Sequence, residues 1–125
     1  MLGILLVALG GGIGSAARYL VGGWFATRSG VIFPYGTLVV NVTGSFIIGF
    51  FLAFAQERLW LGPYWRLFFA IGFVGGYTTF STFEYETIRL VQDGELLLGI
   101  VYFFGSVLTG ALATVGGIAL GSSIQ

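Results

Sequence analysis

The chain has 125 residues, of which 57% are hydrophobic and 8% charged, and its mean hydropathy is +0.99. Five arginines and five acidic residues cannot supply the charged surface that a water-soluble domain requires. A net charge of zero with no Cys and no His argues against nucleic-acid binding, disulfides and most transition-metal sites. The composition predicts an integral membrane protein, not a soluble enzyme.

The charged residues divide the chain into four long uncharged runs, each long enough to cross a bilayer as a helix. We expect an all-α membrane protein in which residues 1–125 form a single four-span transmembrane domain. The predicted spans are about 2–24, 35–56, 65–91 and 96–121, with links at Phe25–Pro34, Glu57–Tyr64 and Gln92–Glu95. A cleaved signal peptide would need a basic segment before the first run, whereas Arg18 comes after it.

Glycine pairs spaced four residues apart occur in the first, third and fourth spans. Each pair places two small residues on one helix face, which lets helix backbones approach closely in a membrane. We interpret them as packing sites: Gly10 with Gly14, Gly72 with Gly76, and Gly117 with Gly121.

Polar residues recur on one helical face of the second span at Thr37, Asn41 and Ser45. Tyr102, Ser106 and Thr109 likewise share one helical face of the fourth span. Each of the two sets forms a stripe of hydrogen-bonding side chains along its helix. Either stripe could hold helices together or could line an ion path. Asn41 is costly to bury in the middle of a membrane, so a functional role is as well supported for it as a structural one.

The third span contains the strongest signal, two adjacent glycines followed by Thr78 and Thr79. Glycine and β-branched threonine are poor helix formers, so we expect the helix to break at mid-membrane depth. Carbonyls freed by such a break, in two copies about a two-fold axis, would suit a small hard cation such as Na⁺.

Beyond the break, Phe80 and Phe83 lie three residues apart on one side of the predicted helix. Because an aromatic ring has a positive edge, two ring edges beside a narrow path would attract a small anion. Thr79, Thr82 and Glu86 share another face of this helix, and Glu86 could pair with Arg89. Ordinary packing of the two phenylalanines remains an alternative.

The arginines favour neither orientation clearly. One membrane face would carry Arg18, Arg28 and Arg89, and the other Arg58 and Arg66 with both termini. A near-tie in the basic residues that set topology indicates that both orientations could insert, so that two copies could assemble antiparallel.

Three segments of the sequence resemble the Fluc family of bacterial fluoride channels, also called CrcB-like fluoride exporters. They are the glycine-rich run that ends in Arg18-Tyr19, the stretch from Gly36 to Gly44, and the stretch from Gly75 to Phe83. The chain length, the number of spans and the distribution of charges are also similar to this family.

The resemblance implies an antiparallel homodimer with two fluoride pores and a structural Na⁺ at the dimer interface. It implies that backbone carbonyls of Gly75 and Thr78 hold the Na⁺. It places the following residues along the fluoride pore: Arg18, Thr37, Asn41, Phe80, Ser81, Thr82, Phe83, Glu86, Tyr102 and Ser106. Glu84 and Gly110 depart from the usual family pattern, where serines are common.

Two other functions fit the sequence less well. A proton-coupled exporter like the small multidrug resistance proteins needs a carboxylate deep in a span, but Glu84 and Glu86 lie toward the end of the third. A subunit that only packs against a larger complex would have no reason to concentrate polar residues and a helix break at one depth.

We therefore expect a passive fluoride channel of the bacterial inner membrane. Its expected partners are fluoride, membrane lipid and a second copy of itself.

Overall fold

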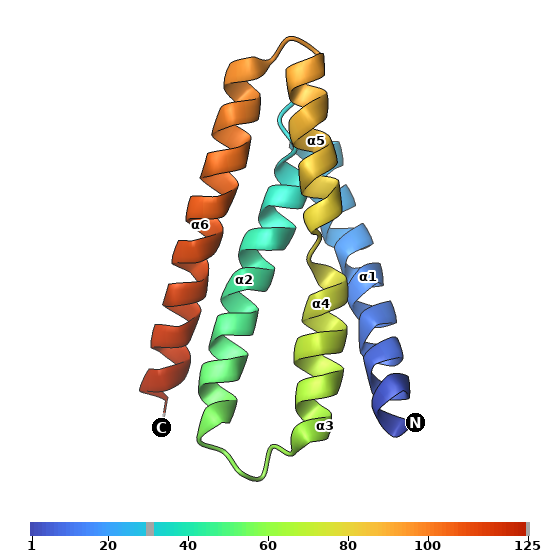
Figure 1. The fold of residues 1–125 in the computed structure, drawn as a ribbon, viewed down its shortest axis with the longest axis vertical. Helices are drawn as coiled ribbons and strands as arrows, with labels where there is room; N and C mark the ends of the chain where they lie inside the picture. Colours follow the sequence, from blue (N-terminus) through green and yellow to red (C-terminus); the bar gives the residue numbers. More distant parts are fainter. Residues whose placement is uncertain (30–31, 125) are drawn as a thin grey trace.

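The computed structural model describes residues 1–29 and 32–124, and this part of the chain is helical with no strand (Figure 1). Three long continuous helices are α1 (Leu2–Ser29), α2 (Tyr35–Gln56) and α6 (Leu96–Ser123). A fourth, interrupted rod follows α2 and precedes α6 in chain order. The predicted all-α architecture with a broken third span is confirmed.

The interrupted rod consists of α3 (Pro63–Trp65), η1 (Arg66–Val74), α4 (Gly75–Tyr77) and α5 (Phe80–Gln92). The helix breaks between α4 and α5, where Thr78 (φ −85°, ψ 159°) and Thr79 (φ −149°, ψ 121°) are extended. The predicted interruption is thus present, one residue beyond the two glycines, which are still helical. The nine-residue π-helix η1, in which hydrogen bonds run from residue i to i+5, was not predicted.

The predicted end of the first span was wrong, because α1 continues to Ser29 and not to residue 24. No proline interrupts the last turns, and Thr27, Arg28 and Ser29 hydrogen-bond to carbonyls of Trp24 and Ala26. Part of the predicted link is therefore helical, and its residues 30 and 31 lie outside the described part. The other span boundaries agree with the prediction to within two residues.

The helices pack in two pairs (Figure 1). α2 lies along α6, and α1 lies along η1 and α4. A Cβ atom added at Gly14 would overlap the Phe73 carbonyl, and one at Gly117 would overlap the Phe46 carbonyl. The predicted close packing at these glycines is confirmed, and only a residue without a side chain fits at such contacts.

Arg58 links the C-terminal end of α2 to the C-terminal end of α6. Its Nη1 donates to the Phe54 carbonyl at 2.7 Å, and its Nη2 donates to the Ile124 carbonyl at 2.8 Å. The guanidinium also lies 3.6 Å from the centroid of the Phe54 ring. This arginine therefore fixes the end of the chain against the link that follows α2.

Three described helices, α1, α2 and α6, are long and apolar enough to cross a membrane. The interrupted rod runs alongside these helices, with its axis also along the length of the bundle (Figure 1). Both termini lie at the end of the molecule that carries the α2–α3 link. The large apolar side chains on the outside of α1 and α6 are exposed, as expected where lipid covers a helix. The chain is a multi-pass membrane protein.

Candidate functional site

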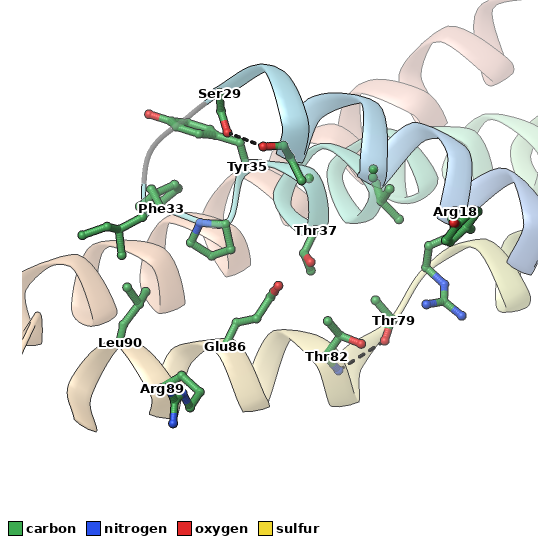
Figure 2. Close-up of a pocket in the computed structure, with 18 of the residues that line it drawn as sticks. Arg18, Ser29, Phe33, Tyr35, Thr37, Thr79, Thr82, Glu86, Arg89 and Leu90 are labelled. Atoms are coloured by element: carbon green, nitrogen blue, oxygen red, sulfur yellow. Dashed lines mark hydrogen bonds between the residues drawn. The ribbon is translucent and has the colours of Figure 1, made fainter. Parts of the chain in front are cut away.

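A cavity of about 550 Å³ lies between α1, α2 and α5 (Figure 2). Its polar lining includes Arg18, Thr37, Thr79, Thr82, Glu86 and Arg89. Figure 2 shows Glu86 reaching from α5 toward Thr37 on α2. The predicted shared face of Thr79, Thr82 and Glu86 is confirmed, because all three border this cavity.

Glu86 is joined to α6 by Tyr102, whose hydroxyl donates to the Glu86 Oε1 at 2.9 Å. Tyr102 is completely buried, and Thr37 also interacts with its hydroxyl. The expected pair between Glu86 and Arg89 was wrong. Arg89 instead lies 3.6 Å from Asp93, one turn farther along, where both side chains are half-exposed. The Glu86 carboxylate accepts from Tyr102 on α6, and Arg89 pairs with Asp93 at the i,i+4 spacing instead.

Ser106 carries an unusual hydroxyl one helical turn after Tyr102. Its Oγ is buried and has no hydrogen-bond partner among the described residues. Thr109 on the same helix donates to the Gly105 carbonyl at 2.6 Å, the usual way in which a helical hydroxyl is satisfied. A buried O–H group without a partner is costly, and it is a donor that a ligand could use.

The two phenylalanines are neighbours but occupy different environments. Their ring centroids are 6.1 Å apart, yet Phe80 is 73% exposed and Phe83 only 5%. Phe83 packs on Tyr102 (5.2 Å) and Phe103 (5.6 Å). Phe33 meets Tyr102 edge-on at 5.4 Å and was missed by sequence reasoning. Of the two predicted phenylalanines, Phe83 is the one that packs against Tyr102 within the chain.

Asn41 does not point into open space but holds the helix break. Its Nδ2 donates to the Thr79 carbonyl at 2.9 Å, and its Oδ1 accepts from the Thr79 N–H at 2.8 Å. The Thr79 hydroxyl in turn accepts from the Thr82 N–H at 3.3 Å and caps α5 (Figure 2). One N–H of the Asn41 amide is not used in these bonds.

Arg18 reaches the break from α1. Its Nε donates to the Gly76 carbonyl at 3.2 Å, and the Ser15 hydroxyl lies 3.5 Å from the same oxygen. Arg18 therefore borders the cavity and also steadies the backbone before the break. Ser15 was not predicted as a site residue, since a serine in a glycine-rich helix gives no distinctive signal.

The comparisons with known proteins show the family to which the chain belongs. Residues 5–118 match the family of CrcB-like proteins, described as Camphor Resistance (CrcB). The chain belongs to the CrcB-like family. It is 49% identical over 120 residues to "Fluoride-specific ion channel FluC" of Acidobacterium capsulatum, covering 96% of both chains.

Two further relatives have the same name. The CrcB-like chain is 52% identical over 109 residues to the protein of Solibacter usitatus, covering 87% of this chain and 89% of the relative. It is 48% identical over 117 residues to that of Rhizobium meliloti, covering 94% of both. The name of these relatives is that of a channel and not of an enzyme.

In this CrcB-like chain, four of the ten predicted residues line the cavity, namely Arg18, Thr37, Thr82 and Glu86. Thr37, Glu86, Tyr102 and Phe83 lie together, and Ser106 follows one turn along α6. Ser81 is exposed and lies apart from the cavity lining. The site offers hydroxyl, amide and guanidinium donors, which suit a small anion better than a hydrophobic substrate.

Proposed function

We propose that the chain is a fluoride-selective ion channel, which lets cytoplasmic fluoride leave passively down its electrochemical gradient. The observation that carries the proposal is its near full-length similarity, at about half identity, to proteins named fluoride-specific ion channels. The expected sites along the path are Arg18, Thr37, Asn41, Phe80, Ser81, Thr82, Phe83, Glu86, Tyr102 and Ser106.

The chemistry of the site supports fluoride as the ion. Fluoride is small and accepts strong hydrogen bonds, so it crosses a membrane only where donors replace its water. The unpartnered Ser106 hydroxyl and the remaining Asn41 N–H are such donors. Glu86 orients the Tyr102 hydroxyl, and the positive ring edge of Phe83 lies beside it.

The proposed assembly is an antiparallel homodimer. Phe80 and Ser81 are exposed in the single chain although they belong to the proposed path, so a second copy is needed to enclose them. The arginines remain close to balanced: Arg58 and Arg66 flank the α2–α3 link, and Arg28 and Arg89 lie toward the other end. Such a balance allows both orientations to insert.

A structural Na⁺ at the dimer interface is part of the proposal. In a continuous helix the Gly75 carbonyl would bond the Thr79 N–H and the Thr78 carbonyl the Thr82 N–H. Both N–H groups bond to side chains instead, so the two carbonyls lack their helical donors. Neutral carbonyl oxygens are suitable ligands for Na⁺, and two copies would provide four of them.

The proposed location is the bacterial inner membrane. Fluoride enters a cell as the weak acid HF and is trapped as F⁻ at the higher cytosolic pH. A passive channel then reduces its toxicity without any energy-coupling step. The expected partners are fluoride, membrane lipid and the second copy, with no nucleic acid.

The test uses purified protein in liposomes loaded with either fluoride or chloride, with efflux measured by ion-selective electrodes. We expect fast fluoride release, and chloride release no faster than from protein-free liposomes. Equal release of both ions would disprove selectivity, and no fluoride release from verified dimers would disprove the function. Dependence of fluoride release on an imposed pH gradient would instead favour a proton-coupled exporter.

A further inference from the structure

The helix break is held open by two diverted N–H groups. The Thr79 N–H, which would bond to the Gly75 carbonyl in a helix, bonds to Asn41 Oδ1 at 2.8 Å. The Thr82 N–H, which would bond to the Thr78 carbonyl, bonds to Thr79 Oγ1 at 3.3 Å. Each diverted donor leaves one carbonyl without its helical partner.

These two diversions have different origins. Thr79 caps α5 locally, as N-terminal threonines do, by accepting from the third residue along. Asn41 acts from α2, 38 positions away in sequence, and also donates to the Thr79 carbonyl at 2.9 Å. Asn41 thus bonds to both the N–H and the carbonyl of Thr79, so the position of the break depends on the packing of α2.

The rest of the break is held independently. The Thr78 N–H and Oγ1 both bond to the Val74 carbonyl at 3.0 Å, which completes the last turn of α4. Arg18 and Ser15 contact the Gly76 carbonyl. None of these groups bonds to the Gly75 or Thr78 carbonyl. The side chains that keep these two carbonyls without their helical donors are therefore Asn41 and Thr79.

We propose that Asn41 and Thr79 are positioning residues for the cation site: they divert the N–H groups that would otherwise occupy the Gly75 and Thr78 carbonyls. This inference rests on the proposed Na⁺ site, and it gives Asn41 a role besides lining the anion path. When either diversion is lost, the released N–H competes with the cation for a carbonyl.

The test is the Na⁺ dependence of thermal unfolding of the purified full-length protein, with N-methyl-D-glucamine replacing Na⁺ at constant ionic strength. Binding to the native state raises the melting temperature by mass action, so the Na⁺ concentration at half-maximal stabilisation reports affinity. For Thr79→Val and Asn41→Leu we expect this concentration to rise roughly tenfold or more, as one competing hydrogen bond would cause.

Matched variants separate this role from general damage. Thr79→Ser keeps the acceptor oxygen and should restore the wild-type Na⁺ midpoint. Asn41→Asp keeps an oxygen that can accept from the Thr79 N–H, so its Na⁺ midpoint should be no higher than that of the wild type. This variant still tests the role of Asn41 if Asn41→Leu does not fold. Ser45→Ala removes a hydroxyl one turn farther along α2 and should leave the midpoint unchanged.

The outcomes distinguish the two proposals. Unchanged Na⁺ midpoints in Thr79→Val and Asn41→Leu, with a Na⁺-dependent wild type, would overturn the positioning role and leave the Na⁺ site standing. A wild type insensitive to Na⁺ would overturn both the Na⁺ site and this inference. In that case the liposome assay still decides whether the chain conducts fluoride.

Discussion

The Tyr102 hydroxyl donates a 2.9 Å hydrogen bond to the Glu86 carboxylate and so links α6 to α5 inside the bundle. Tyr102 is fully buried and is packed by Phe33 and Phe83. Glu86 is partly buried and borders the cavity, and the hydrogen bond from Tyr102 replaces part of the water that its carboxylate loses. The hydrogen bond to Glu86 therefore fixes the direction of the Tyr102 hydroxyl, which is the first hydroxyl in the polar stripe of α6.

Removing this hydroxyl should reduce both stability and flux. Tyr102→Phe keeps the ring and leaves the Glu86 carboxyl without its donor, at a cost of about 1–3 kcal/mol in the free energy of unfolding. We expect fluoride efflux per dimer to fall about tenfold, the rate equivalent of one hydrogen bond. Ser123→Ala, which removes an exposed hydroxyl at the far end of the same helix, is the control. Wild-type efflux from Tyr102→Phe would argue against the proposed path.

Ser106 allows function to be separated from folding. Because its Oγ has no partner in the described part of the chain, Ser106→Ala should leave the melting temperature unchanged or raise it slightly. If the hydroxyl replaces water around fluoride, efflux should still fall by about tenfold. Melting curves and electrode traces on the same preparation test this. A loss of stability without a loss of efflux would mean that the hydroxyl is structural.

The different burial of the two phenylalanines predicts different effects of the same substitution. Phe83→Ile should cost about 1–1.5 kcal/mol in the free energy of unfolding, because a buried ring is replaced by a smaller side chain. Phe80→Ile should cost the isolated chain almost nothing. If ring edges guide fluoride, both variants should reduce efflux while the dimer still elutes as wild type. Full efflux in both would leave the rings as packing only.

Topology can be tested with single cysteines, since the chain has none. Leu59 is 96% exposed in the α2–α3 link and is a better site than Arg58, which holds the chain end. An impermeant thiol reagent added outside intact cells should label about half of Leu59→Cys, because the balanced arginines allow both orientations. Gln92→Cys at the opposite end should behave in the same way. Labelling of only one variant from outside would rule out dual topology.

Two glycines of α1 provide a matched pair for packing. A Cβ at Gly14 would overlap the Phe73 carbonyl, so Gly14→Ala should destabilise the protein by about 1–3 kcal/mol. A Cβ at Gly12 meets no atom within 4 Å, so Gly12→Ala should be neutral or gain up to about 1 kcal/mol from helix propensity. Melting temperatures in detergent measure both. Equal behaviour of the two variants would contradict the close contact between α1 and η1.

The spans and the break could be predicted because they depend on local composition. Charged residues bound the apolar runs, and Thr78 and Thr79 follow two glycines, so both features are legible over a few residues. The end of α1 was missed because its last turn is supported by side-chain bonds to backbone carbonyls, from Arg28 to Trp24 and from Ser29 to Ala26, which depend on side-chain conformation. The π-helix was missed because no single residue marks it.

The site was less predictable than the fold. The types of residue in it could be picked out, but the partner of Asn41 could not, because its bonds to Thr79 depend on how α2 packs against the broken rod. Glu86 was assigned a neighbour on its own helix, whereas its hydrogen bond comes from Tyr102 on the next. Contacts between helices are set by tertiary packing, which a single sequence does not reveal.

The interrupted third rod also bears on biogenesis. α5 has 13 residues and carries Glu84, Glu86 and Arg89, whereas an autonomous spanning helix needs about 20 apolar residues. A translocon would not release such a segment into lipid alone, since each central charge costs about 2.5–3.5 kcal/mol. The short turn after α5 leads directly to α6, which has no charged residue and is apolar enough to cross a membrane. We therefore expect α5 to enter the bilayer as a hairpin with α6, so that substitutions that make α6 more polar should appear first as faulty insertion of α5.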